Sequence, residues 1–179
     1  MTDLTRALLD AAADLLAAHG SRGLRMVDVA TRAGVSRQTV YNEFGNKETL
    51  VRAVALDKTG QFLAGVHDRL TAAADPLEGL RAAVEFVLDQ AARDPLPHSV
   101  FSGANAEDML PFITTRGHEI LSAAAEVFAA HVAAHWPHVP EDHRALVAQT
   151  TVRLVVSHLL TPSGDAPAMV VAVTRALLA

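Results

Sequence analysis

Residues 26–44, with the sequence MVDVATRAGVSRQTVYNEF, constrain the fold of this chain more than any other stretch. Apolar residues recur at helical spacing on both sides of Gly34, and Val40 and Phe44 define one buried line. Gly34 can adopt a left-handed backbone, and Ser36 is a favourable N-cap for the segment that follows. The stretch therefore predicts a helix, a tight turn and a second helix that ends near Phe44.

Proline and glycine divide the rest of the chain into further helical segments. No stretch shows a convincing strand pattern. We expect helices at about 4–20, 47–73, 76–94, 115–135, 141–160 and from 165 onward, with short helices and loops between Pro95 and Ile113. The expected fold is all-α with about nine helices. A three-helix helix-turn-helix domain at residues 1–50 precedes a helical domain at residues 51–179.

Composition narrows the class of protein. Half of the 179 residues are hydrophobic, which is enough to bury a core, and the absence of cysteine excludes disulfides, thiolate catalysis and cysteine-based zinc sites. Charges at Asp3, Arg6, Asp10 and Asp14 break up any signal-peptide core. No uncharged apolar run reaches the roughly 18 residues of a membrane span. We expect a soluble protein of the cytoplasm.

Charge is unevenly distributed along the chain. The net charge of −5 divides into +1 for residues 1–60 and −6 for residues 61–179. Residues 21–47 carry five basic against two acidic side chains, a balance of +3. A modestly basic head on an acidic body is compatible with nucleic-acid binding through the head.

The sequence GLRMVDVATRAGVSRQTVYNEFGNKETL, residues 23–50, carries a family pattern. Its pieces are Gly23-Leu24, Asp28-Val29-Ala30, Ala33-Gly34-Val35-Ser36, Thr39-Val40-Tyr41, Phe44 and Lys47-Glu48-x-Leu50. With these pieces the region from about Leu4 to Leu56 resembles the DNA-binding domain of the tetracycline-repressor (TetR) family of regulators. The remaining two-thirds of the chain resembles that family only in being helical.

The resemblance implies a ligand-responsive regulator, a repressor that a small molecule releases from its operator. The aromatic and aliphatic residues of the body favour a hydrophobic molecule in this role. The resemblance also implies a homodimer on palindromic double-stranded DNA, with recognition helices in successive major grooves about 34–36 Å apart. Ligand binding in this family usually swings the helix that begins near Lys47. No enzyme activity, cofactor or membrane partner is expected. Two alternatives stay open: a dimeric ligand-binding module that has lost specific DNA recognition, and a helical enzyme.

A helical wheel assigns roles within the second motif helix. With Val40 and Phe44 buried, Gln38 and Asn42 face away from the core, where their amides can read base edges. In the family the tyrosine hydroxyl and the lysine that opens the next helix contact phosphate. The expected DNA-contacting residues are Arg25, Ser36, Arg37, Gln38, Thr39, Tyr41, Asn42 and Lys47. The alternative for this set is an exposed helix face with no partner.

Two residues depart from the family pattern. Arg25 stands where the family often has a capping Thr or Ser, and it cannot accept a backbone N–H, so we expect a missing cap. Glu43 stands where the family commonly has a His or Tyr on phosphate. We expect its carboxylate either to face a phosphate or to pair with a cation such as Lys47.

The body supplies apolar residues with a few polar ones between them, as in many small-molecule sites. The ligand-binding candidates are Phe62, Val66, His67, Val84, Val87, Phe101, Asn105, Met109, Phe112, His118, Leu121 and Phe128. The alternative for each aromatic residue is ordinary core. The last two helices are apolar on several sides, and the resemblance implies that they pair with a partner's as a four-helix bundle. Burial within one chain is the alternative.

Nine histidines raise the question of a metal site. His131 and His135 lie one helical turn apart, a spacing that can hold a metal ion, and His138 and His143 follow. No HExxH motif or cysteine ligand accompanies them. We therefore expect solvated histidines on a helix face and no metal.

Overall fold

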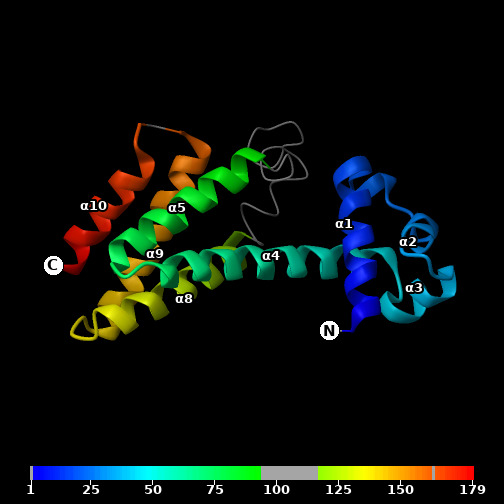
Figure 1. The fold of residues 1–179 in the computed structure, drawn as a ribbon, viewed down its shortest axis with the longest axis horizontal. Coiled ribbons are helices and arrows are strands. Elements are labelled where there is room, and N and C mark those ends of the chain that lie inside the picture. Colours follow the sequence, from blue (N-terminus) through cyan, green and yellow to red (C-terminus); the bar gives the residue numbers. More distant parts are fainter. Residues whose placement is uncertain (1, 94–116, 163) are drawn as a thin grey trace. The chain divides into compact units, whose positions relative to one another are not determined.

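The computed structural model describes residues 2–93, 117–162 and 164–179. Among these residues it contains eight helices and no strand, which confirms an all-α fold and differs little from the expected count of nine (Figure 1). The helices are α1 (Asp3–Gly23), α2 (Met26–Arg32), α3 (Arg37–Phe44), α4 (Lys47–Ala72), α5 (Pro76–Arg93), α8 (Gly117–His135), α9 (Glu141–Leu160) and α10 (Ala166–Leu178). The short helices expected between Pro95 and Ile113 lie outside the described residues.

The chain divides into two compact units, which we call the N-terminal unit (Met1–Gln61) and the C-terminal unit (Phe62–Ala179). The division falls inside α4, the long helix that contributes residues to both units. The expected division at residue 50 also falls inside this helix.

Local capping chemistry sets the ends of the motif helices. The Thr39 N–H donates to Ser36 Oγ at 3.1 Å and caps α3, and Gly34 has a φ of 69° in the turn before it. The Thr49 N–H donates to Asn46 Oδ1 at 2.8 Å and caps α4. Arg25 precedes α2 without a side-chain cap, as its chemistry predicts. In α1, Gly20 leaves the helical conformation at φ 66°, and a last turn continues to Gly23.

The N-terminal unit packs α1, α2, α3 and the start of α4 around one apolar core. Leu8, Val29, Val40 and Leu50 have no exposed surface, so each of the four helices contributes at least one fully buried side chain. α3 is anchored in this core by Val40 and by Phe44, which is 8% exposed. The core therefore fixes which face of α3 points outward.

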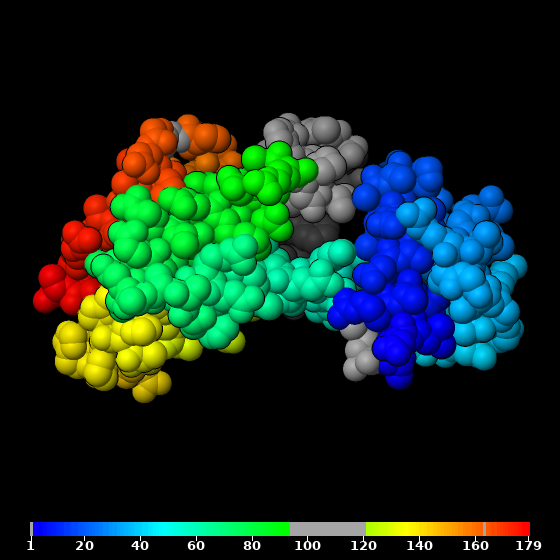
Figure 2. Space-filling view, in the orientation of Figure 1, coloured from blue at the N-terminus to red at the C-terminus, as the bar shows by residue number. Residues whose placement is uncertain are grey.

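The C-terminal unit packs α5, α8, α9 and α10 with the end of α4. Its core includes Leu70, Val132, Val147 and Val170, one from each of four helices. α10 packs against both α5 and α9, and Figure 2 shows α10 (red) beside α5 (green). No helix among the described residues is long and apolar enough to cross a membrane.

Candidate DNA-binding surface

α3 presents a polar face opposite its buried side. Gln38 and Asn42 are exposed, and Gln38 Nε2 donates to Asn42 Oδ1 at 2.8 Å. Both amides point away from Val40 and Phe44, as the helical wheel predicts. Their mutual hydrogen bond holds the two amides on one stripe, with spare donors and acceptors available for base edges.

The other residues of α3 and its cap that are expected to contact DNA also interact with one another. Arg37 Nη2 donates to the Tyr41 hydroxyl at 3.2 Å, and the guanidinium carbon lies 5.1 Å from the centre of the Tyr41 ring. The hydroxyls of Ser36 and Thr39 lie 2.8 Å apart. These exposed contacts are weak in water, so a base or phosphate can replace them.

Cations of the N-terminal unit fall into two groups. Arg32 donates to Asp14 Oδ2 at 2.6 Å, and Arg6 pairs with Asp57, so these two charges are balanced. The cations without an ion pair among the described residues are Arg22, Arg25, Arg37, Lys47, Arg52 and Lys58. The Lys47 ammonium donates to the Arg22 carbonyl at 3.3 Å, near the end of α1, where the helix dipole favours a cation.

Glu43 has a partner that neither expectation named. The Thr5 hydroxyl on α1 donates to Glu43 Oε1 at 2.5 Å, while Lys47 bonds a backbone carbonyl instead. The expected pairing of Glu43 with Lys47 is therefore wrong. Sequence spacing gave no signal for this contact, because Thr5 and Glu43 lie 38 positions apart.

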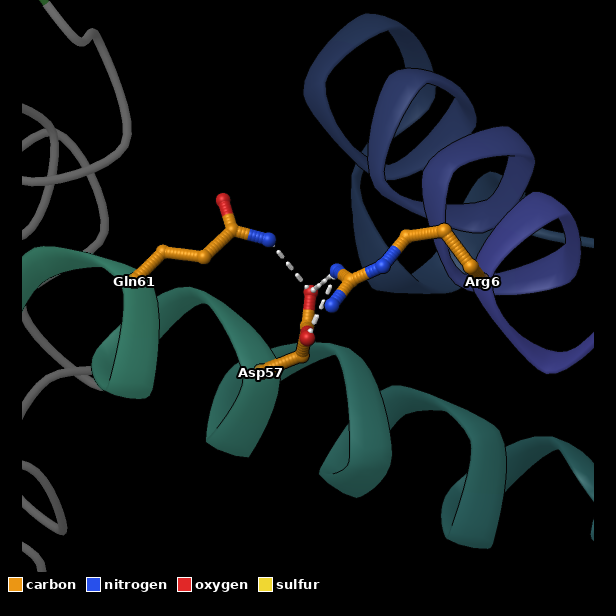
Figure 3. A network of polar contacts seen from close by, with 3 residues as sticks. All are labelled: Arg6, Asp57 and Gln61. Carbon is orange, nitrogen blue, oxygen red and sulfur yellow. Dashed lines mark hydrogen bonds and ion pairs between the residues drawn. The ribbon is translucent and has the colours of Figure 1, made fainter. Parts of the chain in front are cut away.

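A second polar contact joins α1 to α4. Arg6 Nη1 donates to both carboxylate oxygens of Asp57 at 2.8 Å, and Gln61 Nε2 donates to Asp57 Oδ2 at 2.8 Å (Figure 3). The Asp57 side chain is 13% exposed and the Arg6 side chain 41%. This ion pair is thus better shielded from water than an ordinary surface pair.

The ligand-binding candidates are spread over different environments of the C-terminal unit. Val84 and Phe128, 2% and 5% exposed, lie in the core cluster. Phe62, Val66, Val87 and Leu121 are half-buried, and His67 is exposed. Phe101, Asn105, Met109 and Phe112, with the side chain of His118, lie outside the described residues.

Two hollows open on the C-terminal unit. One, of about 190 Å³, is lined by Leu77, Trp136, Arg175, Leu178 and Ala179. The other, of about 90 Å³, is lined by Leu121, Ser122, Ala125, Gln149, Val152 and Arg153. Both are smaller than the roughly 300–1,000 Å³ of typical small-molecule pockets. Of the expected ligand-binding residues that the structure describes, Leu121 alone lines either hollow.

His131 departs from the expectation of solvated histidines. It is 6% exposed, whereas His135, His138 and His143 are exposed. Its Nε2 lies 3.2 Å from the Pro76 carbonyl oxygen, which can only accept, so this nitrogen carries the proton. Across residues 2–93, 117–162 and 164–179, no three His, Cys, Asp or Glu side chains form a group that could hold a metal ion.

Burial lowers the pKa of His131 below its ordinary value of 6.5. The Pro76 carbonyl opposes this shift, and His135 and His67 add to it. Because the folded state favours the neutral ring, its contribution to stability is complete above about pH 6.5 and is lost as the pH falls below that value. In urea unfolding, the free energy of unfolding of the His131→Gln variant should therefore fall less between pH 7.5 and 5.5 than that of the wild type.

His138→Gln, at an exposed position, is the matched control for this comparison. It should keep the pH dependence of the wild type. An unchanged pH dependence in His131→Gln as well would contradict the assigned role of the buried ring.

Comparison with known proteins places these features in a family. Residues 8–54 match the family model of bacterial regulatory proteins of the tetR family, and residues 75–178 match that of the bacterial tetracyclin repressor C-terminal domain. The chain is 31% identical over 160 residues to the HTH-type transcriptional regulator AlkX of Mycobacterium tuberculosis, covering 89% of this chain and 76% of AlkX. It is 35% identical over 82 residues to the HTH-type transcriptional activator FasR of Mycolicibacterium smegmatis, covering 46% of this chain and 37% of FasR.

A solved structure gives the same result. The crystal structure of the TetR family repressor AlkX from Dietzia sp., implicated in biodegradation of n-alkanes, aligns with a TM-score of 0.66 at 26% identity, over 97% of this chain and 92% of AlkX. The helix-turn-helix, its exposed α3 and the helical body define a DNA-binding transcriptional regulator. Within that class, the chain belongs to the TetR family. This confirms the resemblance seen in the sequence and places the chain in a family of transcriptional regulators.

Proposed function

We propose that this protein is a repressor that binds a palindromic operator as a homodimer and is released by a hydrophobic small molecule. The observation that carries the proposal is the exposed stripe of Gln38 and Asn42 on a helix anchored from behind by Val40 and Phe44. Residues 1–50 then act as the DNA-binding domain, and residues 51–179 bind the effector and the second subunit. The protein acts on DNA in the cytoplasm.

Each DNA-facing residue has a role that suits its chemistry. Gln38, Thr39 and Asn42 read base edges, and Arg37 reaches guanine O6 and N7 from the first turn of α3. The phosphate contacts come from Arg25, Ser36, Tyr41 and Lys47, whose charges and hydroxyls fix the register of α3 on the duplex.

Selection from random double-stranded DNA tests this assignment. The protein should enrich an inverted repeat with half-sites one helical turn apart, about 34–36 Å between centres. Enrichment of no common sequence by a folded dimer would support the alternative of a ligand-binding module without DNA recognition.

Arg37 and Lys47 should affect DNA binding in different ways. Arg37→Ala should relax the preference at one base pair per half-site, at a cost of about 1–3 kcal/mol for the preferred base. Lys47→Ala should weaken binding to all sequences and lower the salt slope by about one. Affinities measured on the operator, on single-base variants and on unrelated DNA distinguish the two effects. Equal losses from both changes on every sequence would show that the roles are wrongly assigned.

The exposed apolar residues of the last two helices support dimerisation there. Leu146 and Leu160 on α9 are 57% and 54% exposed, and Met169 and Val173 on α10 are 46% and 37% exposed. Met169 and Val173 lie one helical turn apart, so they share one face of α10. Their burial against a second copy would remove this apolar surface from water.

Replacing Met169 and Val173 together with aspartate should convert the dimer into a monomer, because two carboxylates would be buried at the subunit interface. Sedimentation velocity at micromolar concentration measures the change. Leu56→Asp, at a 66% exposed position on α4, is the control and should remain dimeric. A dimeric double variant would place the interface elsewhere.

Half-buried apolar residues of the C-terminal unit support a hydrophobic effector. Phe62 and Val66 on α4, Val87 on α5 and Leu121 on α8 come from three helices, and the Phe62 ring stacks on Phe86 at 5.9 Å. The Dietzia AlkX supports the same choice, since that repressor is implicated in the biodegradation of n-alkanes. We therefore assign the effector to long-chain alkanes or their oxidised derivatives.

The effector class can be tested by measuring whether a compound releases the protein from operator DNA. Long-chain alcohols and fatty acids should lower the fluorescence anisotropy of a labelled operator in complex with the protein, and their short-chain analogues should not. Equal insensitivity to both classes would reject a hydrophobic effector while leaving DNA binding intact.

A further inference from the structure

The first turn of α1 carries two adjacent side chains that reach different helices. Thr5 donates to Glu43 on α3, and Arg6 donates to Asp57 on α4. We propose that Glu43 is a positioning residue, which acts through Thr5 to fix the angle of the recognition helix rather than contacting DNA. The inference rests on the proposed function, in which α3 enters the major groove.

α3 needs such a contact because its apolar anchoring is narrow. The helix has eight residues; its two buried side chains, Val40 and Phe44, lie on one line along its axis, and the half-buried Tyr41 packs against the same core on one flank. Anchors on one line and one flank resist translation of a short helix better than they resist its rotation toward that flank. Glu43 lies about 100° around the helix from Phe44, so a bond from its carboxylate to α1 opposes this rotation.

The N-terminal end of α1 is suited to hold a carboxylate. The Thr5 N–H donates to Thr2 Oγ1 at 3.1 Å, and the two threonine hydroxyls lie 2.6 Å apart. Because the Thr5 hydroxyl has one proton and gives it to Glu43, the Thr2 hydroxyl donates to Thr5. The three groups form a chain of hydrogen bonds, and the positive end of the α1 dipole favours the Glu43 charge.

Arg6 extends this arrangement to α4. The guanidinium binds both oxygens of Asp57, and Gln61 holds the same carboxylate from the next turn of α4 (Figure 3). Arg6 thereby fixes the first turn of α1 on α4, and the adjacent residue Thr5 holds α3 from the same turn. Adjacent residues of one helical turn thus set the orientation of the recognition helix relative to α4.

Substitutions that remove the hydroxyl or the carboxylate test the inference. Thr5→Val and Glu43→Ala should each weaken operator binding about tenfold or more, as expected for a hydrogen bond to a charged group. The double variant should lose no more than the weaker-binding single variant, since both changes break the same contact. Thr5→Val changes no charge, so its affinity for unrelated DNA should stay the same.

Two variants serve as controls. Thr5→Ser keeps the donor and should restore operator affinity to within about twofold of the wild type. Thr59→Val removes a hydroxyl that, in the described part of the chain, bonds only the Ala55 carbonyl of its own helix, and it should leave operator affinity unchanged. Thermal unfolding of all variants separates a positioning effect from a loss of fold.

Amide hydrogen exchange in the free protein provides a readout that does not depend on DNA. The amides of residues 41–44 on α3 should exchange faster in Thr5→Val than in the wild type, while those of α2 should not. Unchanged exchange would overturn the inference, as would a Glu43→Ala variant that binds every DNA sequence more tightly while Thr5→Val has no effect. A wild type without sequence-specific binding would instead reject the proposed function.

Discussion

Replacement of Gln38 and Asn42 together with alanine should reduce operator affinity by about 100-fold or more. Each good amide contact with a base contributes about 1–3 kcal/mol of discrimination, and about 1.4 kcal/mol corresponds to a factor of ten. Both side chains lie on the exposed stripe of α3 and hydrogen bond only to one another among the described residues. Their loss should therefore leave the fold intact. Fluorescence anisotropy with operator and with unrelated DNA measures the effect.

Unrelated DNA is the internal control, because its binding depends on phosphate contacts that this double variant keeps. Its affinity should change less than about twofold. Gln90→Ala, at an exposed position on α5, controls for the loss of an amide elsewhere. If the double variant loses affinity equally for operator and unrelated DNA, Gln38 and Asn42 do not take part in base recognition.

Replacement of Gly79 with alanine should destabilise the C-terminal unit by about 2–3 kcal/mol. A Cβ atom at this position would lie 2.4 Å from the Leu70 carbonyl oxygen, so α5 and the end of α4 must move apart. Both Leu70 and Leu80 belong to the core at this crossing, which cannot adapt through a flexible side chain. Urea unfolding followed by the fluorescence of the single tryptophan, Trp136, reports on this unit.

Gly60→Ala on α4 is the matched control. A Cβ atom there meets nothing within 4 Å, so the substitution should stabilise the helix by about 0.5–1 kcal/mol. The two variants make the same chemical change with opposite expected signs. Equal stability of the two variants would show that the approach of α5 to α4 does not require glycine.

The features that the sequence predicted well depend on neighbouring residues. Ser36 caps the helix that follows, as expected, because a capping side chain bonds a backbone N–H only three residues ahead. The buried direction of α3 follows in the same way from Val40 and Phe44, one helical turn apart. Such features involve residues only three or four positions apart, so a short segment of sequence is enough to predict them.

The features that the sequence did not predict depend on distant residues. Nothing near Glu43 points to Thr5, and nothing near Arg6 points to Asp57, 51 positions away. The contact of His131 with the Pro76 carbonyl at the start of α5 joins residues 55 positions apart, so the pattern of its own helix does not predict it.

Equilibrium binding of the wild-type dimer to its selected operator tests the central claim most directly. Anisotropy titrations on the operator and on a scrambled duplex, at several salt concentrations, give both the specificity and the number of phosphate contacts. We predict a preference of about 1,000-fold or more for the operator, with the logarithm of affinity falling linearly with the logarithm of salt concentration. A folded dimer that binds both duplexes equally at every salt concentration would contradict the account.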